Sequence, residues 1–253
     1  MKRICIFLTL IFVLTCSLQA QKTDATNSIK RANEMYKQGQ YSDAAALYEE
    51  ILKNGVSPEL YYNLGNSYYK ADETGLAILN YERALRLDPG LNDASYNLDI
   101  AQQKVVDNIN SSPSFFVKRW INSLIESYTT NQWAIISVVA FIAMLVLFFL
   151  FAFSSTRSKR KYAFYASFFA GFLFVLSLSF SGIRKDEILK HHDAIVLSGA
   201  VTAKSSPDKS GTDIFQLHEG TRVTVKNLLG NWVEIKLENG AVGWIEESNI
   251  ERI

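Results

Sequence analysis

The chain has 253 residues, a length that allows more than one small domain, and a formal net charge of only +1. That charge is unevenly distributed: residues 22–110 carry 9 basic and 13 acidic side chains, residues 111–183 carry 6 and 1, and residues 184–253 carry 9 and 11. Both flanking segments are mildly acidic, which argues against nucleic-acid binding, because nucleic-acid-binding domains present a basic patch.

The N-terminus has the layout of a secretory signal peptide. Basic residues precede an apolar run over 4–14, and small and polar residues follow it. We predict a signal peptide over 1–20 that is cleaved after Ala20. Two alternatives stay open, namely lipidation of Cys16 or an uncleaved anchor, for which the apolar run is short. Cys5 is the only other cysteine, so a cleaved chain would contain no disulfide and no thiolate ligand.

Residues 22–110 contain a repeat with a period of 33–34 residues. The tripeptide Tyr-Asn-Leu at 62–64 recurs at 96–98, and this period is typical of helix–turn–helix repeats. Segment 58–91 fits one 34-residue repeat whose signature positions are Tyr61, Leu64, Gly65, Tyr68, Ala77, Tyr81, Ala84 and Pro89. This pattern resembles the tetratricopeptide repeat (TPR) family. The resemblance implies an all-α superhelix, with a weaker first repeat over 26–57 and a closing helix over 92–108.

Two small residues of the second repeat indicate close helix packing. Gly65 and Ala77 stand where the TPR resemblance implies that the two helices of the repeat cross. Pro89 follows the second helix and ends it, because proline cannot continue the helical hydrogen-bond ladder.

The resemblance also implies a concave face that binds extended peptides or helices. Family geometry places on it the candidate partner-binding residues Asn33, Tyr36, Tyr62, Asn63, Asn66, Tyr69, Lys70 and Asn97, together with Lys37 and Lys104. One TPR subtype clamps a terminal carboxylate with lysine and asparagine. Asn33 and Asn63 match its asparagines, but its basic positions are Ile29, Asp93 and Asn97 here, so the asparagines also fit an ordinary TPR sequence.

The middle of the chain predicts two transmembrane helices. Uncharged apolar runs cover 133–153 and 162–183, and 21 residues rising about 1.5 Å each span roughly 31 Å, the thickness of a bilayer core. The intervening segment 154–161 has four basic residues, Arg157, Lys159, Arg160 and Lys161, which is typical of a cytoplasmic loop. This topology places the flanking domains on the periplasmic side of the inner membrane, in agreement with the signal peptide.

An amphipathic segment, 111–132, precedes the first span. Its apolar residues recur at helical spacing, and its charged and polar residues occupy the other face. Two interpretations stay open: a helix that lies in the membrane interface, or a helix that docks on the repeats.

After a linker over 184–193, residues 194–253 change to short alternating runs. They predict about five strands, over 194–197, 201–203, 221–225, 232–237 and 243–245, separated by Gly, Pro, Asn and Asp turn signals. Five strands in about 60 residues favour a small closed barrel, which would hide the sheet edges. Segments 201–225, 231–245 and 248–253 resemble bacterial SH3 domains. Two interpretations of Trp232 and Trp244 stay open, packing in the barrel core or a ligand platform, since some relatives bind cell-wall peptides and others are spacers or docking modules.

The sequence contains no recognisable catalytic motif. There is no phosphate-binding glycine loop, and the only histidines, His191, His192 and His218, have no carboxylate at metal-ligand spacing. We therefore expect no catalytic residue, no metal and no cofactor.

The order of these parts resembles the BatE-type proteins of the Bat aerotolerance operons of Bacteroidetes. The resemblance implies a partner role beside other Bat-type membrane proteins and a link to oxidative-stress tolerance or envelope integrity. We expect a multidomain membrane protein with an all-α TPR superhelix, two transmembrane helices and an all-β SH3-like barrel. Its expected function is that of a periplasm-facing adaptor, and the alternative is peptidoglycan binding through the SH3-like domain.

Overall fold

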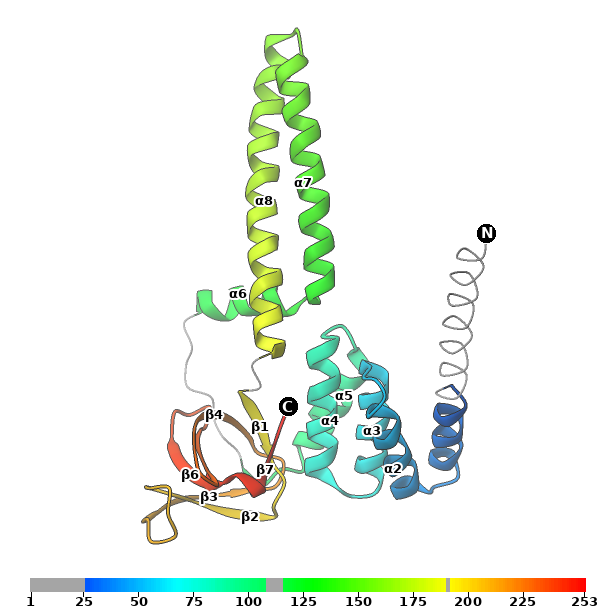
Figure 1. Cartoon of the computed structure of the whole chain (residues 1–253), viewed down its shortest axis with the longest axis vertical. Coiled ribbons are helices and arrows are strands. Elements are labelled where there is room, and N and C mark those ends of the chain that lie inside the picture. The colour runs from blue at the N-terminus through cyan, green and yellow to red at the C-terminus, as the bar shows by residue number, and fades with distance from the viewer. Residues whose placement is uncertain (1–25, 108–115, 190–191) are drawn as a thin grey trace, which may run out of the picture.

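The computed structural model describes residues 26–107, 116–189 and 192–253 (Figure 1). The predicted signal peptide, with Cys5 and Cys16, lies outside these residues. Three parts follow one another along the chain: a helical array, a helical hairpin and an antiparallel sheet (Figure 1). The chain leaves the array, passes up and down the hairpin and returns, so that the sheet lies beside the array below the hairpin (Figure 1).

Five helices form the array, which confirms the predicted all-α N-terminal region. They are residues 26–37, α2 (Tyr41–Leu52), α3 (Pro58–Lys70), α4 (Thr74–Leu87) and α5 (Asn92–Gln102). Ser57 caps α3 by accepting a hydrogen bond from the Leu60 amide at 3.1 Å, and Pro58 occupies the first turn, where a missing N–H costs nothing. α4 ends at Leu87, because the residue before Pro89 disfavours the helical conformation.

α3 and α4 cross closely at Gly65, as the small residues indicated. A Cβ atom added to Gly65 would lie 2.7 Å from the Tyr81 ring and 3.3 Å from the carbonyl oxygen of Ala77. Ala77 itself is fully buried. Only small residues at these two positions allow the backbones to approach this closely.

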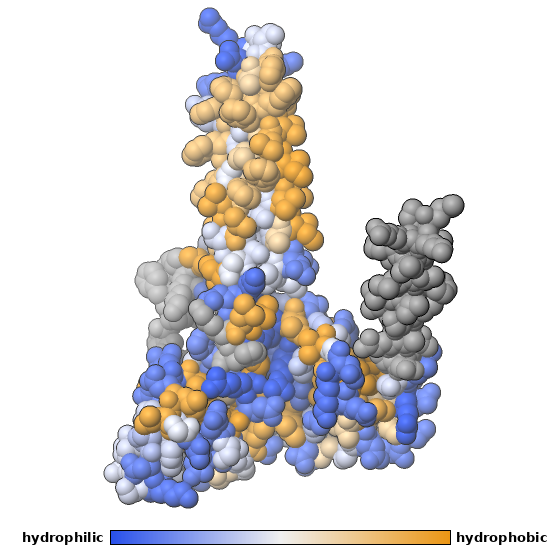
Figure 2. Space-filling view, viewed as in Figure 1, coloured by the Kyte–Doolittle hydropathy of each residue, from blue (hydrophilic) through white to orange (hydrophobic). Residues whose placement is uncertain are grey.

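The hairpin consists of two helices that are long and apolar enough to cross a membrane, α7 (Thr130–Phe153) and α8 (Arg157–Leu189). Large apolar side chains along both helices point away from the hairpin; Phe153 is 72% exposed and Phe168 is 75% exposed. Figure 2 shows this apolar surface along most of the hairpin length. A soluble core helix would bury such side chains, so this exposed apolar surface indicates association with a membrane.

α8 is longer than the predicted span over 162–183. It begins within the predicted basic loop and continues through part of the predicted linker as far as Leu189. Arginine and lysine are good helix formers, and no proline interrupts these residues, so the helix extends beyond its apolar section.

A short helix, α6 (Phe116–Glu126), lies across the base of the hairpin (Figure 1). Its Ile125 packs with Trp133 of α7 and Phe180 of α8, and the Ile125 carbonyl accepts a hydrogen bond from the Trp133 indole at 3.1 Å. Trp120, by contrast, is 68% exposed. These contacts attach one side of α6 to the hairpin and leave the Trp120 side chain open.

The C-terminal part is one antiparallel sheet with the order β3-β2-β6-β5-β4-β1-β7. Its strands are β1 (Asp193–Val196), β2 (Ala200–Lys204), β3 (Asp213–His218), β4 (Arg222–Leu229), β5 (Trp232–Lys236), β6 (Val242–Glu246) and β7 (Ile250–Arg252). A 3-10 turn, η1 (Glu247–Asn249), precedes β7. Alternate residues such as Val201, Ala203, Val233 and Ile235 form the buried core, as expected for strands with one face inward.

The closed barrel expected from the sequence is not what the strand pairing shows. Among the described strands, no pairing joins β3 to β7, so the sheet is open between them. β7 has only three residues, and its outer edge faces α4 of the helical array. Arg83 of α4 donates hydrogen bonds to the Glu251 carboxylate and the Arg252 carbonyl, both at 2.7 Å. A neighbouring domain, rather than barrel closure, thus covers this sheet edge.

Candidate interaction site

The candidate residues on the first helices of the repeats form a hydrogen-bonded group centred on Asn66 of α3. The side-chain oxygen of Asn66 accepts hydrogen bonds from the Tyr81 hydroxyl at 2.8 Å and from the Asn97 amide at 2.7 Å. The same Asn97 amide nitrogen lies 3.5 Å from the Tyr62 hydroxyl. The fold therefore brings Tyr62, Asn66 and Asn97 together from two helices.

Asn63 and Asn66 of α3 differ in how many of their side-chain hydrogen-bonding groups remain available to a ligand. The carbonyl of the Asn66 side chain is shared by two internal donors, so this residue links α3 to α4 and α5. The Asn63 amide is partly exposed and makes no side-chain hydrogen bond within the described part of the chain. Asn63 is thus the better placed of the two to hold a peptide backbone.

At the N-terminal end of this surface, the predicted binding residues Asn33 and Tyr36 contact side chains of α2. Asn33 accepts a hydrogen bond from the Tyr48 hydroxyl, and the ring of Tyr36 packs edge-on against Tyr41 at 5.3 Å. Burial raises the pKa of Tyr48 to about 12, and burial together with the nearby Tyr41 and Tyr62 raises the pKa of Tyr36. These phenols stay neutral at physiological pH and act as hydrogen-bond donors.

At the other end the surface carries two lysines, of which Lys104 is paired with Asp72. The Lys104 ammonium lies 4.5 Å from the centroid of the Tyr69 ring and 3.0 Å from the Asp72 carboxylate. Lys70 is exposed at the last residue of α3. A ligand lying along the helices would therefore meet tyrosine and amide groups first and lysines at this end.

The two tryptophans of the sheet lie on its face away from the core. The register pairs Trp232 with Glu246 and Trp244 with Glu234, whereas the intervening Val233 and Ile245 are fully buried. Both indoles are therefore half-buried on the outer face, and neither belongs to the buried core. Of the two interpretations of Trp232 and Trp244, packing in the core therefore does not agree with this register.

Two parts of the chain match known families. Residues 29–92 match the model of the tetratricopeptide repeat, and residues 199–251 match the model of the bacterial SH3 domain. No curated protein matches the chain significantly. The first match covers the helices through α4, and the second covers β2 through β6, η1 and the first two residues of β7. Both families are typically non-catalytic interaction domains: the repeat indicates a scaffold for protein partners, and the SH3 domain indicates cell-wall binding.

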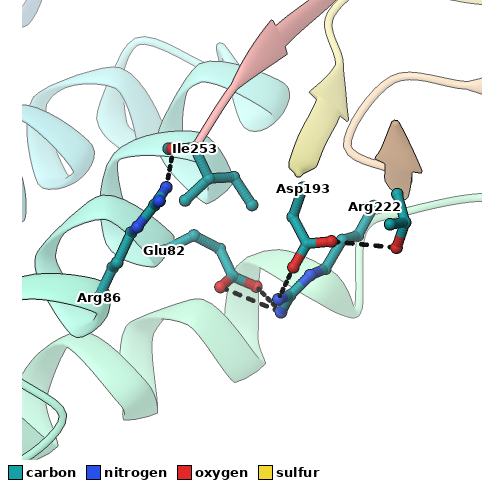
Figure 3. Close-up of polar contacts among 6 residues, drawn as sticks. Glu82, Arg86, Asp193, Arg222 and Ile253 are labelled. Carbon is teal, nitrogen blue, oxygen red and sulfur yellow. Dashed lines mark hydrogen bonds and ion pairs between the residues drawn. The ribbon is translucent and has the colours of Figure 1, made fainter. Parts of the chain in front are cut away.

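Sequence reasoning missed the junction at which the SH3 domain docks on the TPR array. The carboxylate of Glu82 in α4 accepts hydrogen bonds from Arg222 of β4 at 3.1 and 3.2 Å, and Arg222 also contacts Asp193 of β1 at 2.7 Å (Figure 3). Burial raises the pKa of Glu82, against the opposing effect of Arg222. Arg86 of α4 donates to the Ile253 carbonyl beside this group (Figure 3).

Apolar packing joins the same two parts. Ile78 and Leu79 of α4 share one buried cluster with Ile195 and Ile253 of the SH3 domain. Gly220 has a positive φ of +85°, and a Cβ atom there would lie 2.9 Å from Ile78 and 2.7 Å from Val105. A larger residue would therefore strain the turn and separate the two surfaces.

A third contact fastens the end of the array to the SH3 domain. Asp107 accepts hydrogen bonds from the His218 amide at 2.7 Å and the Thr221 hydroxyl at 2.6 Å, and its other oxygen lies 2.7 Å from the His218 imidazole. Partial burial acts to raise the pKa of Asp107, but these hydrogen bonds outweigh it and lower the pKa below its ordinary value. The TPR array and the SH3 domain are thus joined by the ion pairs Glu82–Arg222 and Arg83–Glu251, by the hydrogen bonds of Asp107 and by a shared core.

In residues 26–107, 116–189 and 192–253, no group of three or more histidine, cysteine or carboxylate side chains could hold a metal ion. Of the charged groups at the junction, Glu82 pairs with Arg222 and Arg83 pairs with Glu251 across it, whereas Arg86 donates to backbone carbonyls. Their arrangement therefore serves docking.

Proposed function

We propose that this protein is a membrane-anchored scaffold whose TPR array holds a partner protein along the surface formed by α3, α5 and residues 26–37. One observation carries this proposal: the SH3 domain covers α4 on the opposite side and leaves this surface open. The side chains of Asn63 and Lys70 there make no hydrogen bond within the described part of the chain, and the tyrosines supply rigid contact area with few rotors to freeze.

The hairpin supports membrane anchorage. Its outward apolar side chains need lipid around them, and α7 with 24 residues rises roughly 36 Å, enough for a bilayer core of about 30 Å. The array and the SH3 domain are docked on each other, which requires that they lie on the same side. The basic residues at the hairpin tip favour the cytoplasm for the tip, which leaves both domains on the periplasmic side of the inner membrane.

α6 suits a position in the membrane interface at the periplasmic side. Ile125 holds it to the hairpin base, and the exposed indole of Trp120 has the amphipathic character that favours the headgroup region. In this position α6 would set the height of the docked domains above the bilayer.

The partner class follows from the order of the domains. The predicted signal peptide, the TPR array, the hairpin and the SH3 domain, in this order, resemble BatE-type proteins. We therefore propose other Bat-type membrane proteins as partners, in a complex that serves aerotolerance or envelope integrity.

The test is partner capture by the full-length chain from detergent-solubilised membranes, identified by mass spectrometry. Replacing Asn63 and Lys70 together by alanine should weaken capture about fivefold per hydrogen bond lost, on the basis of about 1 kcal/mol each. Asn54→Ala, at an exposed turn after α2, is the matched control. Undiminished capture by the Asn63→Ala/Lys70→Ala variant would remove this surface from the proposal.

A second candidate function is binding of peptidoglycan by the SH3 domain. The outward position of Trp232 and Trp244 favours it, since a pair of indoles off the core offers a stacking surface. The full-length chain should co-sediment with purified peptidoglycan, and Trp232→Ala/Trp244→Ala should abolish this without releasing protein partners. If the Trp232→Ala/Trp244→Ala variant loses the partners while the Asn63→Ala/Lys70→Ala variant keeps them, the SH3 domain is the recognition module.

A further inference from the structure

A shallow, open cavity of about 350 Å³ lies at the tip of the α7–α8 hairpin, the end far from both domains. Three cationic side chains and three aromatic rings line it: Arg157, Arg160, Lys161, Phe151, Phe164 and Tyr165. The Arg160 guanidinium lies 5.7 Å from the centroid of the Phe151 ring. In Figure 2 the hydrophilic tip directly adjoins the apolar surface of the hairpin. The cavity therefore combines positive charge with apolar contact area.

The chain supplies no negative charge to balance these cations. No aspartate or glutamate occurs between Glu126 and Asp186, and none of the ion pairs in the described part of the chain involves Arg157, Arg160 or Lys161. These residues also occupy the first turns of α8, where positive side chains oppose the helix dipole. These cations are solvent-exposed, and an anion from outside the chain would offset both their mutual repulsion and their opposition to the dipole.

The depth of the tip identifies that anion. The inference rests on the membrane insertion proposed above: when α7 spans the bilayer core, its C-terminal end reaches the level of the lipid phosphates. Phosphate oxygens accept hydrogen bonds from arginine and lysine, and the lipid glycerol and upper acyl chains lie just below the phosphate. Both features of the cavity are thus matched by one molecule.

We propose that this cavity is a binding site for the headgroup of an anionic phospholipid. Arg157, Arg160 and Lys161 hold its phosphate oxygens, and Phe151 and Phe164 contact the apolar part below. The preference of basic loops for the cytoplasm depends only on the number of positive charges, so Lys159 contributes to it as much as Arg157, Arg160 or Lys161 does. A binding site instead separates the three lining residues from Lys159, which does not line the cavity.

This difference gives a charge-matched test. The full-length chain in detergent is analysed by native mass spectrometry with added phosphatidylglycerol or phosphatidylcholine. We expect preferential phosphatidylglycerol binding, reduced about tenfold in Arg160→Gln and in Arg157→Gln but unchanged in Lys159→Gln, although each variant loses one charge. Equal losses in all three variants, or no loss in any, would overturn the site. Displacement of the lipid by millimolar inorganic phosphate would overturn the assignment to a lipid.

A separate measurement distinguishes failure of this site from failure of membrane anchorage. Wild type and all three variants should stay in the membrane fraction after carbonate extraction. Release of the wild type would contradict anchorage itself. Retention of every protein, combined with wild-type lipid binding by Arg160→Gln, would contradict only the lipid site.

Discussion

The two sides of the TPR array have different neighbours. α4 is packed between α3 and the SH3 domain, so Ile78 and Leu79, on adjacent sides of the helix, are both fully buried. The surface of α3 and α5 has no such cover, and Tyr62, Asn63 and Asn97 remain partly exposed there. The comparison shows how a short array with few repeats can be stabilised: a second domain covers one side, which leaves the other available to a partner.

The largest expected effect concerns the covered side. Ala77→Leu adds volume where Ala77 is fully buried beside Gly65, and overpacking of this kind costs about 1–3 kcal/mol. Urea unfolding of the detergent-solubilised chain measures the loss. Ala46→Leu, at an exposed position of α2, is the control and should leave stability unchanged. Equal stability of both variants would contradict the close crossing.

The junction itself is tested by removing its central cation. Arg222→Gln leaves the carboxylate of Glu82, whose side chain is 11% exposed, without its cationic partner. Because Arg222 is itself 44% exposed, we expect a cost of about 1–2 kcal/mol rather than that of a fully buried pair. Hydrogen exchange along α4 should become faster in Arg222→Gln and not in Lys226→Gln, an exposed position of the same strand. Unchanged protection of α4 would show that docking of the SH3 domain on the array does not depend on the Glu82–Arg222 contact.

The open side predicts a smaller and selective effect. Asn66→Ala removes an acceptor shared by Tyr81 and Asn97 and should cost about 1 kcal/mol. Asn63→Ala should leave stability within experimental error, because its side chain bonds to nothing else in the described part of the array. Thermal unfolding of the two variants distinguishes them, and an equal loss in both would place Asn63 in the internal network.

The smallest expected effect is a dependence of the folding stability on pH in the acidic range. The pKa of Asp107 is lower in the folded chain than in the unfolded chain, so its contribution to stability is fully present above the unfolded value of about 3.9. That contribution is lost as the pH falls through the lowered folded value. Asp107→Asn should therefore reduce the slope of stability against pH below about pH 4 and be least damaging there. An unaltered slope would mean that Asp107 is not held by His218 and Thr221.

Much of the fold could be predicted from local sequence, because its signals are local. Gly65, Ala77 and Pro89 mark a helix crossing and a helix end, and uncharged runs mark the hairpin. β3 was not predicted as a strand, because Ile214 is exposed at the sheet edge and weakens the alternation that marks a half-buried strand. The open sheet was missed for a related reason, since only the neighbouring helix α4 shows that β7 needs no further strand beside it.

The candidate site could be predicted only in part. The TPR register indicated which residues share the surface, but the role of each depends on its partners. Asn63 and Asn66 are the same residue type on the same helix, so the sequence alone does not distinguish their roles. Only the positions of Tyr81 and Asn97 show that Asn66 joins α3 to α4 and α5. The docking junction left one signal, the adjacent apolar residues Ile78 and Leu79, which cannot both be buried by a single neighbouring helix.

The most direct test of the account is the side of the membrane on which each domain lies. Alkaline phosphatase, which is active only outside the cytoplasm, is fused after Asn110, within the tip at Ser158 or after Ile253. Docked domains at the base of a membrane hairpin predict active fusions after Asn110 and Ile253 and an inactive fusion at Ser158. An active fusion after Asn110 with an inactive one after Ile253 would place the two domains on opposite sides, which would contradict both the docking and the hairpin.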